Sequence, residues 1–121
     1  MTDGPVFHPA IPVLRIFDVA KAKEFYVDFL GFTLDWEHRY EPGLPLYAQV
    51  SRSGVKLHLS EHYGDGTPGT VVYIRVDNIS DFLQTLHGKQ ASFARPDPNA
   101  QEAAISDPFG NVLRFDGSRR S

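Results

Sequence analysis

The stretch DVAKAKEFYVDFLGF, residues 18–32, carries a complete helix signal with a start, an apolar face and an end. Asp18 has a short carboxylate that can accept hydrogen bonds from the free N–H groups of a first helical turn, and Gly31 can adopt the left-handed conformation that closes the last turn. Apolar residues recur between them at the three- and four-residue spacing of one buried face: Ala22, Phe25, Tyr26, Phe29 and Leu30. The stretch therefore predicts an amphipathic helix, and residues 13–17 just before it supply a candidate strand for it to pack against.

The pattern of strand, helix and three strands occurs twice along the chain. In the first half, alternation and turn signals predict strands at about residues 11–17, 32–39, 46–51 and 55–60. Residues 62–69 contain three glycines and Pro68, which indicates a loop between two halves. In the second half the same signals predict a strand at 71–76, a helix at 80–87, a short strand at 90–93, and strands at 102–106 and 112–115. The second pattern follows the first at an offset of about 56 to 60 residues, which indicates an internal duplication.

The length of the chain indicates one domain. A chain of 121 residues can bury a core without disulfides or a structural metal, so we expect a single domain over residues 1–121, with modules at about 11–61 and 70–116. The absence of cysteine excludes a disulfide framework, a thiolate zinc site and a cysteine nucleophile.

Charge and hydropathy restrict the partners. Twelve Lys and Arg against fifteen Asp and Glu give a net charge of −3, which argues against a nucleic-acid partner because phosphate binding needs a basic surface. No basic-plus-apolar leader and no apolar run of about 20 residues is present, so we expect no membrane partner and a cytoplasmic location.

The predicted fold class is α+β, with two βαβββ modules that form a curved mixed sheet around a cleft. A helix covers only one face of its sheet, so the other face of each module is free to line that cleft. Strand alternation places these side chains on the free faces: Arg15, Tyr47, Gln49, Lys56, His58, Val71, Tyr73, Arg75 and Arg114. Glu102, at the start of the predicted strand at 102–106, and Asp107, in the turn after it, are interpreted as carboxylates beside turns and are expected to be solvated.

Two segments resemble the vicinal oxygen chelate superfamily, which includes glyoxalase I, ring-cleaving extradiol dioxygenases, fosfomycin-resistance transferases and bleomycin-resistance proteins. These segments are IFDVAKAKEFYVDFLGF, residues 16–32, and SDPFGNVLRF, residues 106–115, and the resemblance spans about residues 11–116. It implies the glyoxalase/bleomycin-resistance fold. It does not specify an activity.

Enzymes of that superfamily hold a divalent metal through His, Gln or Glu on the strands that open and close each half. The corresponding positions in this sequence are Ile11, His58, Val71 and Arg114. Isoleucine and valine have no donor atom and a guanidinium is always positively charged, so only His58 could bind a metal. We therefore expect no metal, no cofactor and no catalytic residue. The alternative is a metal-dependent lyase, isomerase or dioxygenase of the glyoxalase type that uses other ligands.

Among the members of the superfamily, the sequence looks most like the bleomycin-resistance proteins, which sequester a flat, cationic antibiotic without changing it. Those proteins are dimers with the ligand in a groove between subunits, so the resemblance implies a homodimer, swapped or unswapped, and a bleomycin-like small molecule as partner. Acidic residues near the mouth, Asp35, Glu37, Glu41 and Glu61, could attract a cation. The ligand-binding candidates are aromatic, hydrogen-bonding or cationic side chains: Trp36, Tyr47, Gln49, His58, Tyr73, Arg75, Phe109 and Arg114.

Several alternatives stay open at this level. The arginines on the predicted cleft face suit a carboxylate or phosphate ligand better than a cation. Trp36 fits a ligand platform, the core or a dimer interface equally well, and His58 is either a ligand contact or a polar group that lines the cleft. A third functional class, a scaffold or regulatory module without a small ligand, would follow if the protein's own side chains filled the groove.

Overall fold

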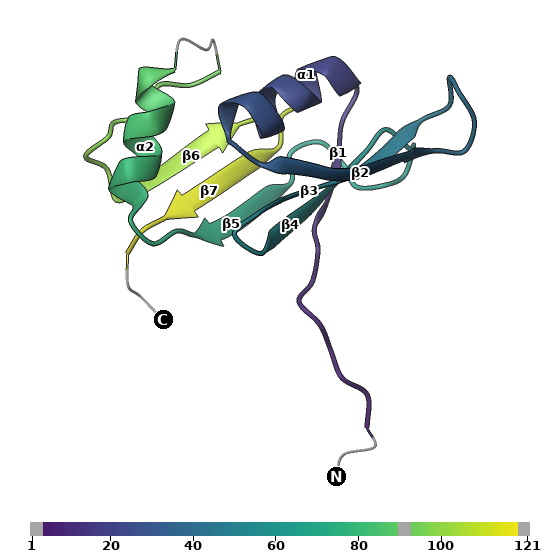
Figure 1. The fold of residues 1–121 in the computed structure, drawn as a ribbon, viewed down its shortest axis with the longest axis horizontal. Helices are drawn as coiled ribbons and strands as arrows, with labels where there is room; N and C mark the ends of the chain where they lie inside the picture. The colour runs from purple at the N-terminus through teal and green to yellow at the C-terminus, as the bar shows by residue number, and fades with distance from the viewer. Residues whose placement is uncertain (1–3, 90–92, 119–121) are drawn as a thin grey trace.

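The first module is a four-stranded sheet with one helix on it (Figure 1). The computed structural model describes residues 4–89 and 93–118. The elements of the first module are β1 (Val13–Arg15), α1 (Val19–Lys23), η1 (Glu24–Phe29), β2 (Thr33–Arg39), β3 (Leu46–Arg52) and β4 (Val55–Ser60). The strand order is β1-β4-β3-β2, with β1 parallel to β4 and the other pairs antiparallel.

The second module repeats this plan with fewer strands among the described residues. Its elements are β5 (Val71–Arg75), α2 (Ile79–Gly88), β6 (Glu102–Ser106) and β7 (Val112–Asp116), in the order β5-β7-β6. Here too the opening strand lies parallel to the closing one. Residues 90–92 of the predicted strand at 90–93 lie outside the described residues, and Phe93 lies in a bend. The α+β fold class is confirmed.

The helix predicted for residues 18–32 is present, with the expected ends. The Asp18 side chain accepts a hydrogen bond from Lys21 N at 3.0 Å, and Gly31 has a φ of +81°. Its second half, η1, is π-helical, and Leu30 N donates to Phe25 O at 2.9 Å. Six residues are too few for the wider π spacing to show in the hydrophobic pattern, so the sequence predicted one continuous α-helix.

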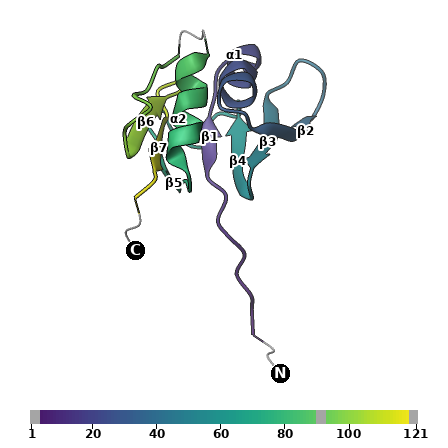
Figure 2. The same ribbon diagram turned by 60° about the vertical axis from the view of Figure 1, so that its left-hand side comes forward.

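The two modules share one hydrophobic core. In both ribbon views the helices of the two modules lie next to each other (Figures 1 and 2), and buried side chains from both modules form a single cluster. The Phe93 ring lies 5.3 Å from that of Phe25 and 5.4 Å from that of Phe29, and Lys89 Nζ donates to Phe29 O at 2.6 Å. The strand residues predicted to face the helices are buried or half-buried: Leu14, Ile16, Leu57, Leu59, Val72, Ile74, Val76, Leu113 and Phe115.

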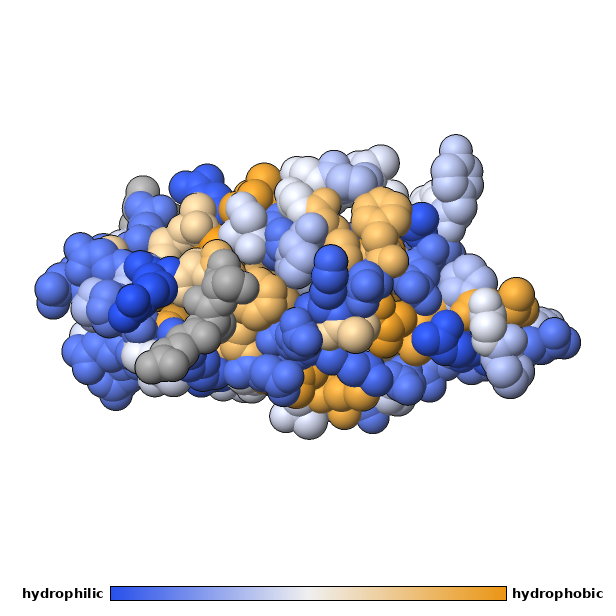
Figure 3. Space-filling view, turned by 90° about the horizontal axis from the view of Figure 1, so that it is seen from above, coloured by the Kyte–Doolittle hydropathy of each residue, from blue (hydrophilic) through white to orange (hydrophobic). Residues whose placement is uncertain are grey.

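The N-terminal arm lies apart from this core. Residues 4–10 project away from the sheets in both views (Figures 1 and 2), and Val6 and Phe7 are 73% and 93% exposed. On the helix-bearing side, apolar residues show as patches among hydrophilic ones (Figure 3). None of the helices in the described ranges has the length and apolarity of a membrane span.

Candidate functional site

Strand alternation exposes one face of the first sheet. In β3, Leu46, Ala48 and Val50 are buried against the core, whereas Tyr47 and Gln49 lie half-buried on the opposite face. The β4 residue His58 lies directly across from Gln49 on this open face. Three predicted ligand-binding residues, two from β3 and one from β4, therefore lie together on this face.

A β-bulge brings Trp36 to the same face. Leu34 and Trp36 are two residues apart, and in a regular strand they would point to the same side. The register shifts between them, so that Leu34 lies opposite the buried Val50 and Trp36 lies opposite Gln49. His38 follows on the same face, opposite Tyr47. His38 is not among the residues predicted from the sequence to bind a ligand, although its two-residue spacing from Trp36 could have identified it.

The side chains of Trp36, Tyr47 and His58 form an aromatic cluster, which with Gln49 we call the aromatic face. The Trp36 and Tyr47 rings are stacked, with centroids 6.1 Å apart and an interplanar angle of 14°. His58 lies edge-on to both, 5.5 Å from Trp36 and 5.0 Å from Tyr47. Trp36 is 44% exposed, so a large, oriented ring surface is available to a flat ligand.

A chain of hydrogen bonds orients this cluster and fixes the His58 tautomer. The Asp35 carboxylate can only accept, so Gln49 Nε2 donates to it at 3.0 Å and turns Gln49 Oε1 toward His58. His58 Nε2 lies 3.0 Å from that oxygen and must carry a proton to bond to it. His58 Nδ1 is then the acceptor for the Tyr47 hydroxyl, at 2.6 Å. A neutral imidazole with its proton on Nε2 satisfies both contacts, with the Tyr47 hydroxyl as the donor to Nδ1.

We expect His58 to titrate below its ordinary range. Burial, and secondarily the positive charge of Lys56, lower the pKa of His58. In the unfolded chain, His58 takes up a proton as the pH falls below about 6.5, whereas in the folded chain it does so only at lower pH. The free energy of unfolding therefore decreases as the pH falls through this range. A ¹H–¹⁵N NMR titration should give a neutral Nε2–H tautomer at pH 7 and a midpoint below the ordinary histidine value of about 6.5. A midpoint at or above about 6.5 would contradict the lowered pKa of His58.

Three further candidates lie on the open face of the second sheet. Tyr73 is paired across the ladder with Arg114, and its hydroxyl donates to the Asp116 carboxylate. Arg75 Nε donates to Ser118 O at 3.2 Å. Phe109 instead lies in the turn between β6 and β7, where its half-buried ring packs 6.1 Å from that of Phe17.

The arginines predicted to attract an anion have acceptors within the chain. Arg15 donates to Glu61 O, and its guanidinium lies 4.6 Å from the Phe17 ring centroid. Arg75 lies 3.8 Å from the carboxylate of Asp77, and Arg114 lies 3.5 Å from that of Glu102. These contacts remove most of the preference for an anionic ligand that the sequence suggested.

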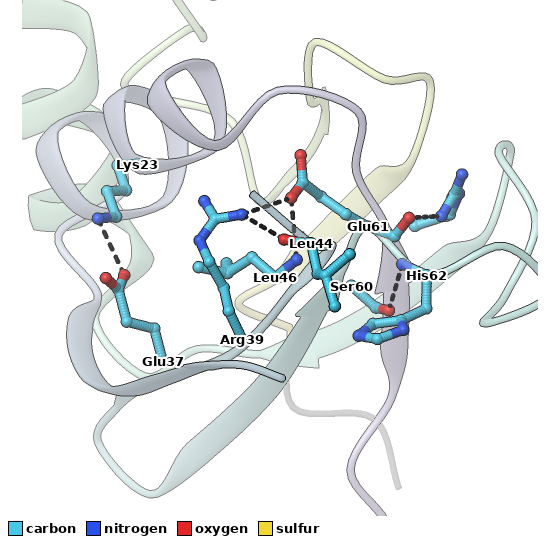
Figure 4. A network of polar contacts seen from close by, with 9 residues as sticks. Lys23, Glu37, Arg39, Leu44, Leu46, Ser60, Glu61 and His62 are labelled. Atoms are coloured by element: carbon cyan, nitrogen blue, oxygen red, sulfur yellow. Dashed lines mark hydrogen bonds and ion pairs between the residues drawn. The ribbon is translucent and has the colours of Figure 1, made fainter. Parts of the chain in front are cut away.

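Two of the four acidic residues predicted to attract a cation, Glu37 and Glu61, form ion pairs (Figure 4). Glu61 Oε1 accepts a hydrogen bond from Leu46 N at 2.9 Å and lies 3.6 Å from Arg39 Nη1. Glu37 forms an ion pair with Lys23 at 2.9 Å. The charges of Glu37 and Glu61 are thus compensated, and ring stacking and hydrogen bonding are the main interactions that the aromatic face offers.

A cavity of about 530 Å³ lies elsewhere, between the two modules. Of the eight predicted ligand-binding residues only Arg75 lines it, and the aromatic face does not contribute to it.

The comparisons with known proteins decide the family. A family model described as "Glyoxalase superfamily protein" matches residues 2–120. The chain belongs to the glyoxalase superfamily. No protein with a curated description matches the chain.

Solved structures of this superfamily are similar over almost the whole chain. A bleomycin-binding protein from bleomycin-producing Streptomyces verticillus, complexed with copper(II)-bleomycin, is 27% identical, with a TM-score of 0.67 over 96% of this chain and 100% of that one. A bleomycin-binding protein complexed with bleomycin is 20% identical, with a TM-score of 0.65 over 93% and 100%. An antibiotic-binding protein from Streptomyces sp. CB03234 is 21% identical, with a TM-score of 0.64 over 93% and 98%. These likenesses confirm the glyoxalase/bleomycin-resistance fold.

The residues present do not fit the divalent metal that glyoxalase-type enzymes hold. The register places Val13 opposite His58, and Ile11 lies before β1. Val13 has no donor atom, and both ring nitrogens of His58 are hydrogen-bonded to neighbouring side chains. Within residues 4–89 and 93–118, no group of three or more His, Cys, Asp or Glu could hold a metal ion.

Proposed function

We propose that this glyoxalase-superfamily protein binds and sequesters a flat aromatic small molecule, of the bleomycin type, without a metal of its own. The observation that carries the proposal is the stacked Trp36–Tyr47 pair on an open sheet face, with Trp36 44% exposed and His58 edge-on to it. Stacked rings bind planar groups, and Gln49 and His58 supply hydrogen bonds beside them. The likeness to the Streptomyces verticillus protein, which was solved with copper(II)-bleomycin, supports the same ligand class.

We propose further that a second copy of the chain completes the groove. The open sheet faces carry exposed apolar side chains, with Trp36 at 44%, Val71 at 56% and Tyr73 at 53%. A homodimer would cover part of these faces and would give the exposed arm residues Val6 and Phe7 a surface to pack on. The dimer, swapped or unswapped, and a cytoplasmic location are parts of this proposal.

Titration with bleomycin tests the proposal directly. Trp36 is the only tryptophan, so its fluorescence reports on the aromatic face alone, and we expect bleomycin to quench it. Removal of the stacking ring in Trp36→Ala should weaken binding measured by calorimetry at least about tenfold. Tyr40→Ala removes an aromatic ring that is 84% exposed in a loop, and it should leave the affinity unchanged.

Two results would count against a passive binder. The first is that bleomycin neither quenches Trp36 fluorescence nor gives a heat of binding, and that the protein does not protect DNA from cleavage by bleomycin. This result would exclude bleomycin as the ligand. Stoichiometric Zn, Ni, Mn or Fe in the purified protein would instead favour the metal-dependent lyase, isomerase or dioxygenase.

A further inference from the structure

The cavity between the modules is built from both halves of the chain. Its volume of about 530 Å³ is in the range of small-molecule sites. Its apolar lining comes from the first module and the second: Phe32, Val55, Ile74, Val76, Phe82 and Phe115. The rest of the wall is polar, with Arg52 from the end of β3 and Asp81 from α2 among its charged groups.

Arg52 is the cation in this wall that lacks a carboxylate partner among the described residues. Its Nη1 donates to Leu30 O at 2.6 Å, and its guanidinium carbon lies 5.2 Å from the Phe82 ring centroid. A guanidinium has five N–H donors, so most of its hydrogen-bonding capacity is free for a ligand. The backbone contact and the ring hold the group in place, and an ordered guanidinium binds a carboxylate with little further loss of conformational entropy.

The other charges in the wall already have partners. Arg75 lies 3.8 Å from the carboxylate of Asp77, and the side chain of Asp77 is 92% exposed to water. The Asp81 carboxylate accepts a hydrogen bond from Asn78 Nδ2 at 2.8 Å. Arg52 is therefore the group best placed to select the charge of an occupant.

We propose that this cavity binds a small apolar carboxylic acid, with its carboxylate on Arg52 and its apolar body against Phe82 and the aliphatic wall. This site is independent of the function proposed for the aromatic face. Because both modules line the cavity, an occupant contacts both at once, and binding raises the thermal stability of the whole domain.

The test compares three ligands that share a phenylalkyl body and carry a negative, a neutral and a positive head group: 4-phenylbutyrate, 4-phenylbutyramide and 4-phenylbutylamine. Calorimetry on the full chain should give an affinity for the acid at least about tenfold higher than for the amide or the amine. Trp36 fluorescence should not change with any of the three, because Trp36 does not line the cavity. Equal affinities, preference for the amine, or a response of Trp36 would overturn the proposal.

Variants locate the site. Arg52→Gln should reduce the affinity for 4-phenylbutyrate about tenfold and leave the affinity for the amide unchanged. Arg95→Gln removes the charge of an exposed arginine that does not line the cavity, and should have no effect.

A second variant keeps the test decisive if Arg52→Gln folds poorly through loss of its bond to Leu30 O. Thr85 is an exposed α2 residue in the cavity wall, and Thr85→Phe should fill the space and abolish binding while circular dichroism stays unchanged. Undiminished binding in a folded Thr85→Phe protein would refute the site.

Discussion

Replacing Asp107 with alanine is expected to lower the free energy of unfolding by about 3–5 kcal/mol, measured by urea denaturation at pH 7. The Asp107 carboxylate accepts hydrogen bonds from the Tyr26 hydroxyl at 2.6 Å, from Phe109 N at 2.8 Å, and from Asn111 N and Nδ2 at 2.9 Å each. Tyr26 and Asn111 are fully buried, so their donors cannot turn to water when the carboxylate is gone.

Asp28→Ala is the matched control, because it removes an exposed carboxylate from the helix of the first module. We expect it to change the stability by no more than about 0.5 kcal/mol. A loss below about 1 kcal/mol for Asp107→Ala would mean that water satisfies the buried donors, and would contradict the structure.

The Tyr26–Asp107 contact joins the two sequence motifs, which lie in different modules. Burial, with the negative charge of Asp107 as the second cause, raises the pKa of Tyr26 far above its ordinary value, so the hydroxyl stays protonated and donates. Asn111 Nδ2 also donates to Arg15 O at 2.9 Å. Residues 106–115 of the second module are thus bonded to residues 15 and 26 of the first, and each motif supplies the partner of the other.

The prediction of a solvated carboxylate is wrong for Asp107 and confirmed for Glu102. Glu102 is exposed, as expected for a residue beside a turn, but Asp107 is only 6% exposed. The turn itself was predicted from Asp107 and Gly110, and Gly110 adopts a φ of +93°. The residues of the turn cannot predict that a buried tyrosine of the other module contacts the Asp107 carboxylate, because that contact joins residues 81 positions apart.

Strands were predicted well because their signals are local. Alternation gave the bounds Val55–Ser60 and Glu102–Ser106 as the structure has them, and β3 differs by one residue. The β-bulge between Leu34 and Trp36 was not predicted, since it depends on pairing with β3 rather than on the sequence of β2.

The candidate site was predictable only in part for the same reason. Alternation placed Tyr47, Gln49 and His58 on one face, but it could not show that a bulge turns Trp36 toward them. It also identified Arg15 and Arg114 on the cleft face without their acceptors, because Glu61 and Glu102 reach them through tertiary contacts. The roles of these residues in binding remain predictions.

Phe25→Ala is expected to cost about 3–5 kcal/mol of stability, comparable with the loss of Asp107. The Phe25 ring is fully buried and lies 4.9 Å from the ring of Tyr26 and 5.8 Å from that of Phe29, both in its own helix. Its third aromatic neighbour, Phe93, comes from the second module at 5.3 Å. A truncated side chain leaves a cavity where the modules meet, and the surrounding rings cannot all move in to fill it.

The number of transitions in the unfolding curve tests whether the two modules unfold together. Because Phe25 and Phe93 join modules that share one core, we expect the variant to unfold in a single transition by circular dichroism and by Trp36 fluorescence. Tyr40→Ala, which removes an exposed ring, should unfold like the unmodified chain. Two separate transitions in Phe25→Ala, with only the Trp36-reported one shifted, would mean that the modules are stable independently and that their contact is not part of the common core.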